Sequence, residues 1–259
     1  MHTGKVWLIG CGPGDMELLT LKAARILQSA DVWLVDDLAG KDILTLARAD
    51  ARIVHVGKRG GCRSTPQLFI NRLMARYARQ GFQVARVKGG DAMLFGRGGE
   101  EQAYLHEHGI ETGIVNGLTS GMAAATSLGV PLTHRDHCRG VAFVTAHGHD
   151  GDEPDWSALA RSGLTLAIYM GTMKAADISE QLIQHGREAT TPVAVISRGT
   201  RVDQHVATGT LEHLATLAKD APMPALIVVG EVVQLHSTLA WFQHTTDTEG
   251  FGSSVVNLA

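Results

Sequence analysis

Apolar positions along the chain follow two periods in turn. Short apolar runs, such as residues 6–9 and 84–87, are typical of buried β-strands. The longer segments between them, such as residues 18–30, have the spacing of amphipathic helices. Strands that alternate with helices predict βαβ units and a mainly parallel sheet, so the expected fold class is α/β.

The alternation restarts after a hinge-like segment, Asn116-Gly117-Leu118. We therefore predict two α/β domains, residues 1–115 and 119–240, and a loose tail over residues 243–259. Residues 205–208 alternate as an antiparallel strand does. The predicted strands are residues 6–9, 31–35, 52–56, 84–87, 112–115, 141–145, 164–170, 193–197, 204–209 and 225–229. The predicted helices are residues 18–30, 66–80, 100–108, 120–128, 175–185 and 211–219.

Composition narrows the class of protein. With 44% hydrophobic and 19% charged residues, the chain can bury a sizeable core. It has neither a long apolar run nor a signal-peptide pattern, so we expect a cytoplasmic protein without membrane association. Its three cysteines are widely spaced and form no CxxC pair, which predicts neither a disulfide scaffold nor a metal site.

A formal net charge of −3 hides a basic segment. Residues 52–97 contain ten Lys or Arg residues and a single acid, Asp91. Five of the basic residues lie beside glycines at predicted strand ends, where ligands bind to open parallel sheets: Lys58, Arg59, Arg63, Lys88 and Arg97. The segment therefore predicts an anionic small molecule. Nucleic-acid binding is an alternative, but the segment lacks the interleaved aromatic residues that this function uses.

Glycine is the compositional outlier, with 30 residues, and eight of these lie in two loops that follow predicted strands. The loops span residues 10–14 and 88–101, and such glycines let a ligand approach the main chain. In the first loop Asp15 stands where a dinucleotide fingerprint requires glycine, although Asp36 follows at the distance of a ribose-binding acid. A nicotinamide oxidoreductase is therefore a further alternative.

A set of short motifs follows in a fixed order along the chain: Gly10-x-Gly-Pro-Gly-Asp, Leu19-Thr20-Leu21-Lys22-Ala23, Val56-Gly57-Lys58-Arg59, Pro66-Gln67, the 88–101 loop, Pro131-Leu132-Thr133-His134-Arg135, Tyr169-Met170-Gly171, Pro192-Val193-Ala194 and residues 225–229. Taken together, these motifs resemble the tetrapyrrole methylase family over about residues 4–235, with the uroporphyrinogen-III C-methyltransferases most similar within it.

The resemblance implies a fold, an activity and partners. The fold is two α/β domains with a cofactor cleft between them, usually in a homodimer. The activity is methyl transfer from S-adenosyl-L-methionine to uroporphyrinogen III, at C2 and then C7. This gives precorrin-2, on the branch to sirohaem, cobalamin and haem d1, with S-adenosyl-L-homocysteine as the second product. Because the first strand follows Met1 closely, we expect a monofunctional enzyme.

The resemblance also implies roles for single residues. Asp36 and Lys58 match a proton acceptor and donor, and Arg97 and Glu100 match catalytic residues that face the tetrapyrrole. Substrate carboxylates are assigned to Arg59, Arg97 and Arg135. The cofactor contacts are assigned to Pro13, Gly89, Gly90, Asp91, Leu94, Thr119, Ser120, Met170 and Gly199.

Several positions depart from the family pattern. Asp37 replaces a basic residue after the second strand, and Asn116 replaces the usual proline of the hinge. Ala92-Met93 stands where Pro-Phe is usual. The alternative within the family is a divergent methylase that acts on another precorrin or on another substrate.

Overall fold

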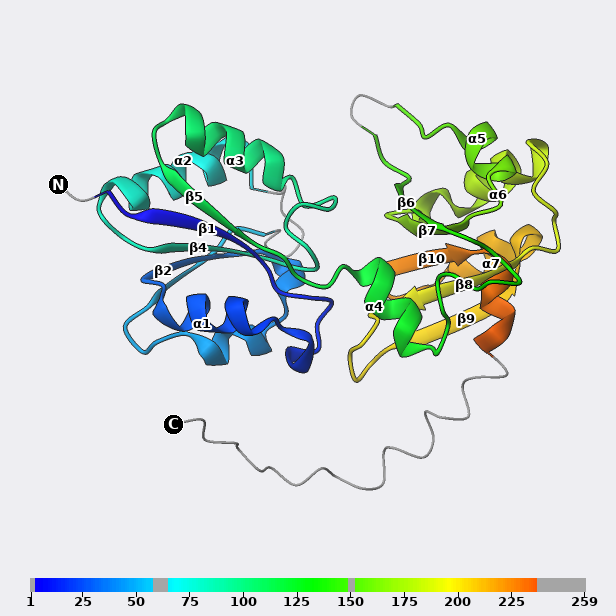
Figure 1. Ribbon diagram of the computed structural model, residues 1–259, viewed down its shortest axis with the longest axis horizontal. Helices are drawn as coiled ribbons and strands as arrows, with labels where there is room; N and C mark the ends of the chain where they lie inside the picture. The colour runs from blue at the N-terminus through cyan, green and yellow to red at the C-terminus, as the bar shows by residue number, and fades with distance from the viewer. Residues whose placement is uncertain (1–2, 58–64, 149–151, 237–259) are drawn as a thin grey trace, which may run out of the picture.

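A computed structural model describes residues 3–57, 65–148 and 152–236, which form two α/β domains (Figure 1). The first domain contains one fully parallel sheet with the strand order β3-β2-β4-β1-β5. Its strands are β1 (Lys5–Gly10), β2 (Val32–Val35), β3 (Arg52–His55), β4 (Val84–Lys88) and β5 (Glu111–Val115).

Helices cover both faces of this sheet, which explains why its central strands are almost continuously apolar. Helix α1 (Leu21–Ser29) packs on one face, beneath Ile9 and Trp33. Helices α2 (Gln67–Arg79) and α3 (Gly98–Glu107) pack on the other, against Leu8 and Leu34 (Figure 1). All five carboxyl ends of the parallel strands consequently lie at one edge, beside the connection to the second domain.

The second domain contains a mixed sheet with the order β6-β7-β10-β8-β9. Helix α4 packs on one face, and helices α5, α6 and α7 pack on the other. The strands are β6 (Val141–Thr145), β7 (Thr165–Tyr169), β8 (Pro192–Ser197), β9 (His205–Thr210) and β10 (Ala225–Val229). The helices are α4 (Ser120–Ser127), α5 (Trp156–Arg161), α6 (Ala175–Gln184) and α7 (Leu214–Ala218).

Strand direction in this second sheet differs from the prediction of a mainly parallel arrangement. Among the neighbouring strands of this described sheet, only β6 and β7 pair in parallel: β10 lies between β7 and β8 and runs antiparallel to both, and β9 runs antiparallel to β8. A strand buried on both faces is continuously apolar whichever way it runs, so its pattern carries no direction. The antiparallel strand expected near residues 205–208 is confirmed as β9, which pairs with β8.

The hydrophobic pattern of the sequence did not predict helix α5. Helix α5 has only six residues, which is too few for a helical period to be recognised in the sequence. Its N-cap, Asp155, is polar and adds no apolar position to the pattern. The predicted tail, residues 243–259, lies outside the described residues. No helix within the described ranges is both long and apolar enough to span a bilayer.

Candidate functional site

Three backbone segments meet at the carboxyl edge of the first sheet. Gly12 and Gly90 form an antiparallel bridge, in which Gly90 N donates to Gly12 O at 2.7 Å and Gly12 N donates to Gly90 O at 3.1 Å. A Cβ atom on Gly10 would lie 2.6 Å from Gly117 N and 2.7 Å from Gly90 O. The end of β1, the loop after β4 and the interdomain connection therefore touch only because glycine occupies all three contact positions.

Asp91 ties the glycine-rich loop to the interdomain connection. One carboxylate oxygen accepts from Gly117 N at 3.1 Å and from Asn116 Nδ2 at 3.3 Å. The other oxygen accepts from Met93 N at 2.8 Å. Asn116 thus supplies a side-chain donor that the usual proline lacks. Asp91 organises the loop around the predicted contacts Gly89 and Gly90, and its own contact with a cofactor stays a prediction.

Other predicted cofactor residues converge on helix α4. Thr119 is buried and precedes the helix, and Ser120 is its first residue. Gly199 follows β8 and packs on α4, where a Cβ atom would lie 2.5 Å from Ala124 Cβ. Met170 directly follows β7, which contacts the same helix. Residues that are far apart in sequence are therefore gathered at the boundary between the two domains.

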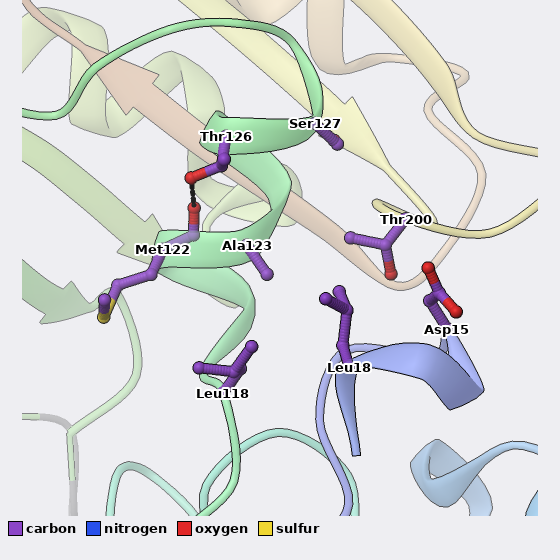
Figure 2. A pocket seen from close by; sticks show the side chains of 8 residues that line it. All are labelled: Asp15, Leu18, Leu118, Met122, Ala123, Thr126, Ser127 and Thr200. Atoms are coloured by element: carbon purple, nitrogen blue, oxygen red, sulfur yellow. Dashed lines mark hydrogen bonds between the residues drawn. The ribbon is translucent and has the colours of Figure 1, made fainter. Parts of the chain in front are cut away.

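A groove of about 400 Å³ lies at this boundary (Figure 2). Asp15 and Leu18 line it from the first domain, and Thr200 lines it from the β8–β9 connection. The remaining lining residues belong to the α4 region: Leu118, Met122, Ala123, Thr126 and Ser127. The lining is mostly apolar, and among the described residues the buried Thr200 hydroxyl has no hydrogen-bond partner. A ligand with an apolar face and a hydrogen-bonding edge fits this groove.

Of these lining residues, only Asp15 and Leu118 lie in segments that the sequence singled out, the first glycine loop and the hinge; Leu18, Met122, Ala123, Thr126, Ser127 and Thr200 do not. Leu118 and Met122 are apolar, exposed and four positions apart at the start of a helix. That spacing beside a glycine hinge is a usable signal, since an exposed apolar pair on one helix face is typical of a binding surface.

Backbone strain is concentrated around the interdomain boundary. The described non-glycine residues with positive φ angles are Phe95, Arg97, Met170, Arg198 and Thr200, with φ between 50° and 69°. They belong to three connections: the loop after β4, the turn after β7 and the turn after β8. Left-handed conformations of this kind cost of order 1–3 kcal/mol each and cluster at ligand sites.

The basic segment is partly neutralised inside the first domain. Arg86 and Lys88 on β4 point toward helices α2 and α3, where both contact the fully buried Glu101. Arg86 Nε lies 2.9 Å from a Glu101 oxygen, and Lys88 Nζ lies 3.4 Å from it. Burial, and then the charge of Arg86, lowers the pKa of Lys88. The prediction that Lys88 faces an anionic ligand is wrong, because alternation along β4 turns it into the helix layer.

The same cluster reaches the predicted proton acceptor. Arg86 Nη2 lies 3.0 Å from Asp36 Oδ2, and the Asp36 side chain is 35% exposed. Asp36 follows β2 and also accepts from Asp37 N at 3.3 Å. The Asp37 carboxylate lies against the backbone of Gly57, at the end of β3. Asp36 is therefore a fixed carboxylate with one side open to solvent.

Three further predicted residues, Arg97, Glu100 and Arg135, lie at the surface. Arg97 and Glu100 form a two-pronged ion pair, with Nη2–Oε2 at 2.6 Å and Nε–Oε1 at 3.0 Å, and its hydrogen bond with Glu100 raises the pKa of Arg97. Arg135 is exposed, in the turn closed by the His134–Cys138 bridge. Pro13 and Leu94 are partly buried. Lys58 and Arg59 lie outside the described residues.

Cys11 is placed in the first glycine loop, but its chemistry is structural. It is buried, and burial raises its pKa to about 12, so the thiolate is scarcely populated at neutral pH. Cys11 therefore acts as a small residue that fills space in the core.

Comparison with known proteins places the chain among methyltransferases. The family described as Tetrapyrrole (Corrin/Porphyrin) Methylases matches residues 5–215. The chain is 56% identical to "Siroheme synthase 1" of Cronobacter sakazakii, over 99% of the chain and 55% of the relative. It is 56% identical to the protein of the same name in Klebsiella pneumoniae, over 100% of the chain and 55% of the relative. The chain thus spans about half the length of these curated relatives.

Solved structures show the same fold. The uroporphyrin-III C-methyl transferase of Thermus thermophilus, complexed with S-adenyl homocysteine, is 39% identical with a TM-score of 0.79. That alignment covers 90% of this chain and 100% of the other. A cobalt precorrin-4 methyltransferase has the same TM-score of 0.79 at 28% identity, with 88% of this chain and 95% of the other covered.

The glycine contact generates a first prediction. Replacing Gly10 by alanine should lower the free energy of unfolding by about 1–3 kcal/mol, because the new Cβ meets two backbone segments that cannot move independently. Gly99→Ala is the matched control, since nothing lies within 4 Å of a Cβ there and alanine favours helix α3. Urea unfolding measures both. Equal stability of the two variants would contradict the steric argument.

The buried ion cluster generates a second prediction. Glu101→Gln should destabilise the fold by about 3–5 kcal/mol, because it leaves Arg86 and Lys88 buried without their shared carboxylate. The neighbouring Glu100→Gln alters a solvent-exposed ion pair and should cost less than about 1 kcal/mol. Chemical denaturation compares the two variants. A Glu101→Gln protein as stable as Glu100→Gln would show that the buried charges are solvated in another way.

Proposed function

The chain belongs to the tetrapyrrole (corrin/porphyrin) methylases, a family of S-adenosylmethionine-dependent methyltransferases, and on that premise we propose that it methylates uroporphyrinogen III. Methylation occurs at C2 and then at C7, and the product is precorrin-2. The observation that carries the proposal is the site between the domains, where the glycine-rich loop, the start of α4 and the ends of β7 and β8 meet. The similarity to the Thermus thermophilus uroporphyrin-III C-methyl transferase supports this choice of substrate.

The site has the features that S-adenosylmethionine requires. Gly90 and its neighbour Gly89 present main chain without side chains, and Gly90 has a φ of +65° that favours glycine. The nearby groove offers apolar surface and the hydroxyl of Thr200, which has no hydrogen-bond partner in the part of the chain that the structure describes. The cofactor supplies a methyl group already activated on a sulfonium sulfur. The residues that would hold it are Pro13, Gly89, Gly90, Asp91, Leu94, Thr119, Ser120, Met170 and Gly199.

Because the methyl group arrives activated, the protein contributes mainly by positioning. The fixed backbone contacts at Gly10, Gly90 and Gly117 hold the glycine loop against the connection to the second domain. Orientation of two reactants in one site can supply about 7–11 kcal/mol in favourable cases. The rigidity of this corner is therefore part of the proposed catalysis.

The acid–base residues act on the tetrapyrrole, which must lose a proton after a ring carbon is methylated. Asp36 is the proposed acceptor, since its carboxylate is held by Arg86 and stays partly open to solvent. Lys58 is the proposed donor. The pair of Arg97 and Glu100 is placed on the glycine loop, facing the substrate in this proposal.

Substrate binding is assigned to arginines, because uroporphyrinogen III carries eight carboxylates. Arg97 uses its Nε and one Nη2 hydrogen for Glu100, so the other guanidinium N–H groups can donate to a substrate carboxylate. Arg135 and Arg59 are the further candidates, of which Arg135 is exposed. We also propose that the enzyme is a cytoplasmic homodimer, and light scattering measures its oligomeric state.

The second candidate is methylation of another precorrin by the same site. The chain has equal TM-scores to a uroporphyrin-III and to a cobalt precorrin-4 methyltransferase. The backbone fold is therefore compatible with either substrate, which supports this second candidate. Asp37, where the family has a basic residue, is the local sequence feature that supports it. The nicotinamide and nucleic-acid hypotheses lose their basis, since the family carries out methyl transfer and the basic segment is partly buried.

A methyl-transfer assay tests the proposal. With labelled S-adenosylmethionine and anaerobic uroporphyrinogen III, we expect the transfer of two methyl groups and the formation of precorrin-2. Absence of product with saturating uroporphyrinogen III, together with normal binding of S-adenosylhomocysteine, would select the second candidate. Absence of S-adenosylhomocysteine binding would overturn both.

Asp36→Asn tests the proton acceptor. We expect a loss of about 10²–10⁴-fold in the rate of methyl transfer, because the amide cannot accept the proton, and unchanged S-adenosylhomocysteine binding. Asp50→Asn is the control, since Asp50 forms an exposed pair with Arg48 at the far end of the first sheet. Wild-type turnover by Asp36→Asn would remove Asp36 from the mechanism.

A further inference from the structure

One side chain, Tyr169, joins the segments that carry the proposed cofactor contacts. It is the last residue of β7 and immediately precedes Met170. Its hydroxyl oxygen lies 2.5 Å from Thr119 Oγ1 and accepts from Gly121 N at 2.6 Å. Its ring lies against that of Phe95, which belongs to the glycine-rich loop of the first domain, with the centroids 4.9 Å apart. In the sequence, Tyr169 stands out only as part of the Tyr169-Met170-Gly171 motif.

The hydroxyl of Tyr169 replaces the cap that helix α4 lacks. The first N–H groups of any helix need acceptors, and a residue such as Thr119 at the N-cap normally supplies one from its side chain. Here the Thr119 side chain makes no capping bond within α4. Its hydroxyl contacts Tyr169 instead, and Tyr169 accepts from the helix. The start of α4 is consequently fixed by the second sheet rather than by its own sequence.

Gly121 makes this capping geometry sterically accessible. A Cβ atom at this position would collide with the Tyr169 hydroxyl and lie 2.7 Å from Phe143 Cε1. The absence of a side chain therefore lets the phenol reach the helix end. Glycine is otherwise unfavourable within a helix, so its presence agrees with a close-approach role.

The ring of Tyr169 lies between two strained segments. Phe95 and Met170 both have left-handed φ angles, 53° and 56°. Such conformations persist in non-glycine residues only where neighbouring contacts hold them. The Phe95–Tyr169 contact is one that crosses between the domains, and it links the glycine-rich loop to the turn that carries Met170.

From these contacts we propose that Tyr169 is a positioning residue for S-adenosylmethionine. Its hydroxyl fixes Thr119 and the start of α4, and its ring holds the Phe95 loop, so both halves of the site are set by one side chain. The inference rests on the proposed function and adds that Tyr169 governs cofactor affinity rather than the methyl-transfer step. It need not touch the cofactor itself.

Tyr169→Phe is the test, because it removes the hydroxyl and keeps the ring. Loss of the hydroxyl's contacts should raise the dissociation constant of S-adenosylhomocysteine, measured by titration calorimetry, roughly threefold to tenfold. KM for S-adenosylmethionine should rise equally, with kcat within about twofold of wild type. Tyr104→Phe is the matched control, since Tyr104 stacks on His108 of the same domain, away from α4.

A double-mutant cycle separates positioning from general stability. If Tyr169 acts through Thr119, the affinity losses of Tyr169→Phe and Thr119→Val will not add in the double variant. Phe95→Leu removes the contact between the Phe95 and Tyr169 rings and leaves the Tyr169 hydroxyl intact. This variant should also weaken the binding of S-adenosylhomocysteine. It tests the proposal independently if Tyr169→Phe does not fold.

Three outcomes overturn the proposal. The first is wild-type affinity in Tyr169→Phe, even if its melting temperature falls. The second is a decrease in kcat with KM unchanged, and the third is additive losses in the cycle. Failure of wild-type protein to bind S-adenosylhomocysteine would instead overturn the proposed function and this inference with it, so the two failures are distinguishable.

Discussion

The contact among Gly10, Gly90 and Gly117 is the constraint on which the rest of the site depends. Parallel strands end at one edge of their sheet, but ordinary side chains would keep the connections that follow them apart. At this corner three backbones approach within the space that a single Cβ would fill. Asp91 can then bond the interdomain connection, and α4 begins directly afterwards. The absence of side chains at these three glycines thus sets the position of α4, the first helix of the second domain, relative to the glycine loop.

The charged residues near the proposed site of the first domain form a buried cluster and an exposed pair. Arg86 and Lys88 stay inside, balanced by Glu101 and by the partly exposed Asp36. Arg97 stays outside, paired with Glu100 in a form that a substrate carboxylate can join. Buried ion clusters stabilise little by themselves, but they become costly when one member is lost. The arrangement therefore keeps the proposed proton acceptor in one place and leaves Arg86 and Lys88 buried, where a ligand at the sheet edge does not contact them.

Strain and aromatic contact coincide at the domain boundary. The left-handed residues fall on three connections, and Tyr169 lies between two of them. A helix end that depends on a phenol from another strand couples the local order of α4 to the packing of the second sheet. The proposed cofactor site consequently depends on both domains, in keeping with a groove whose lining comes from both (Figure 2).

By itself the sequence determined the α/β class, most strands and helices, the two glycine loops and the family, because periodicity and glycine placement are local properties. It did not determine the direction of β10, since a strand buried on both faces carries no directional signal. It also placed Lys88 at the ligand edge, whereas the pleat of β4 turns that side chain toward Glu101, thirteen residues further along the chain. The groove-lining pair Leu118 and Met122 and the role of Tyr169 depend on contacts between elements far apart in sequence, and only tertiary packing brings those together.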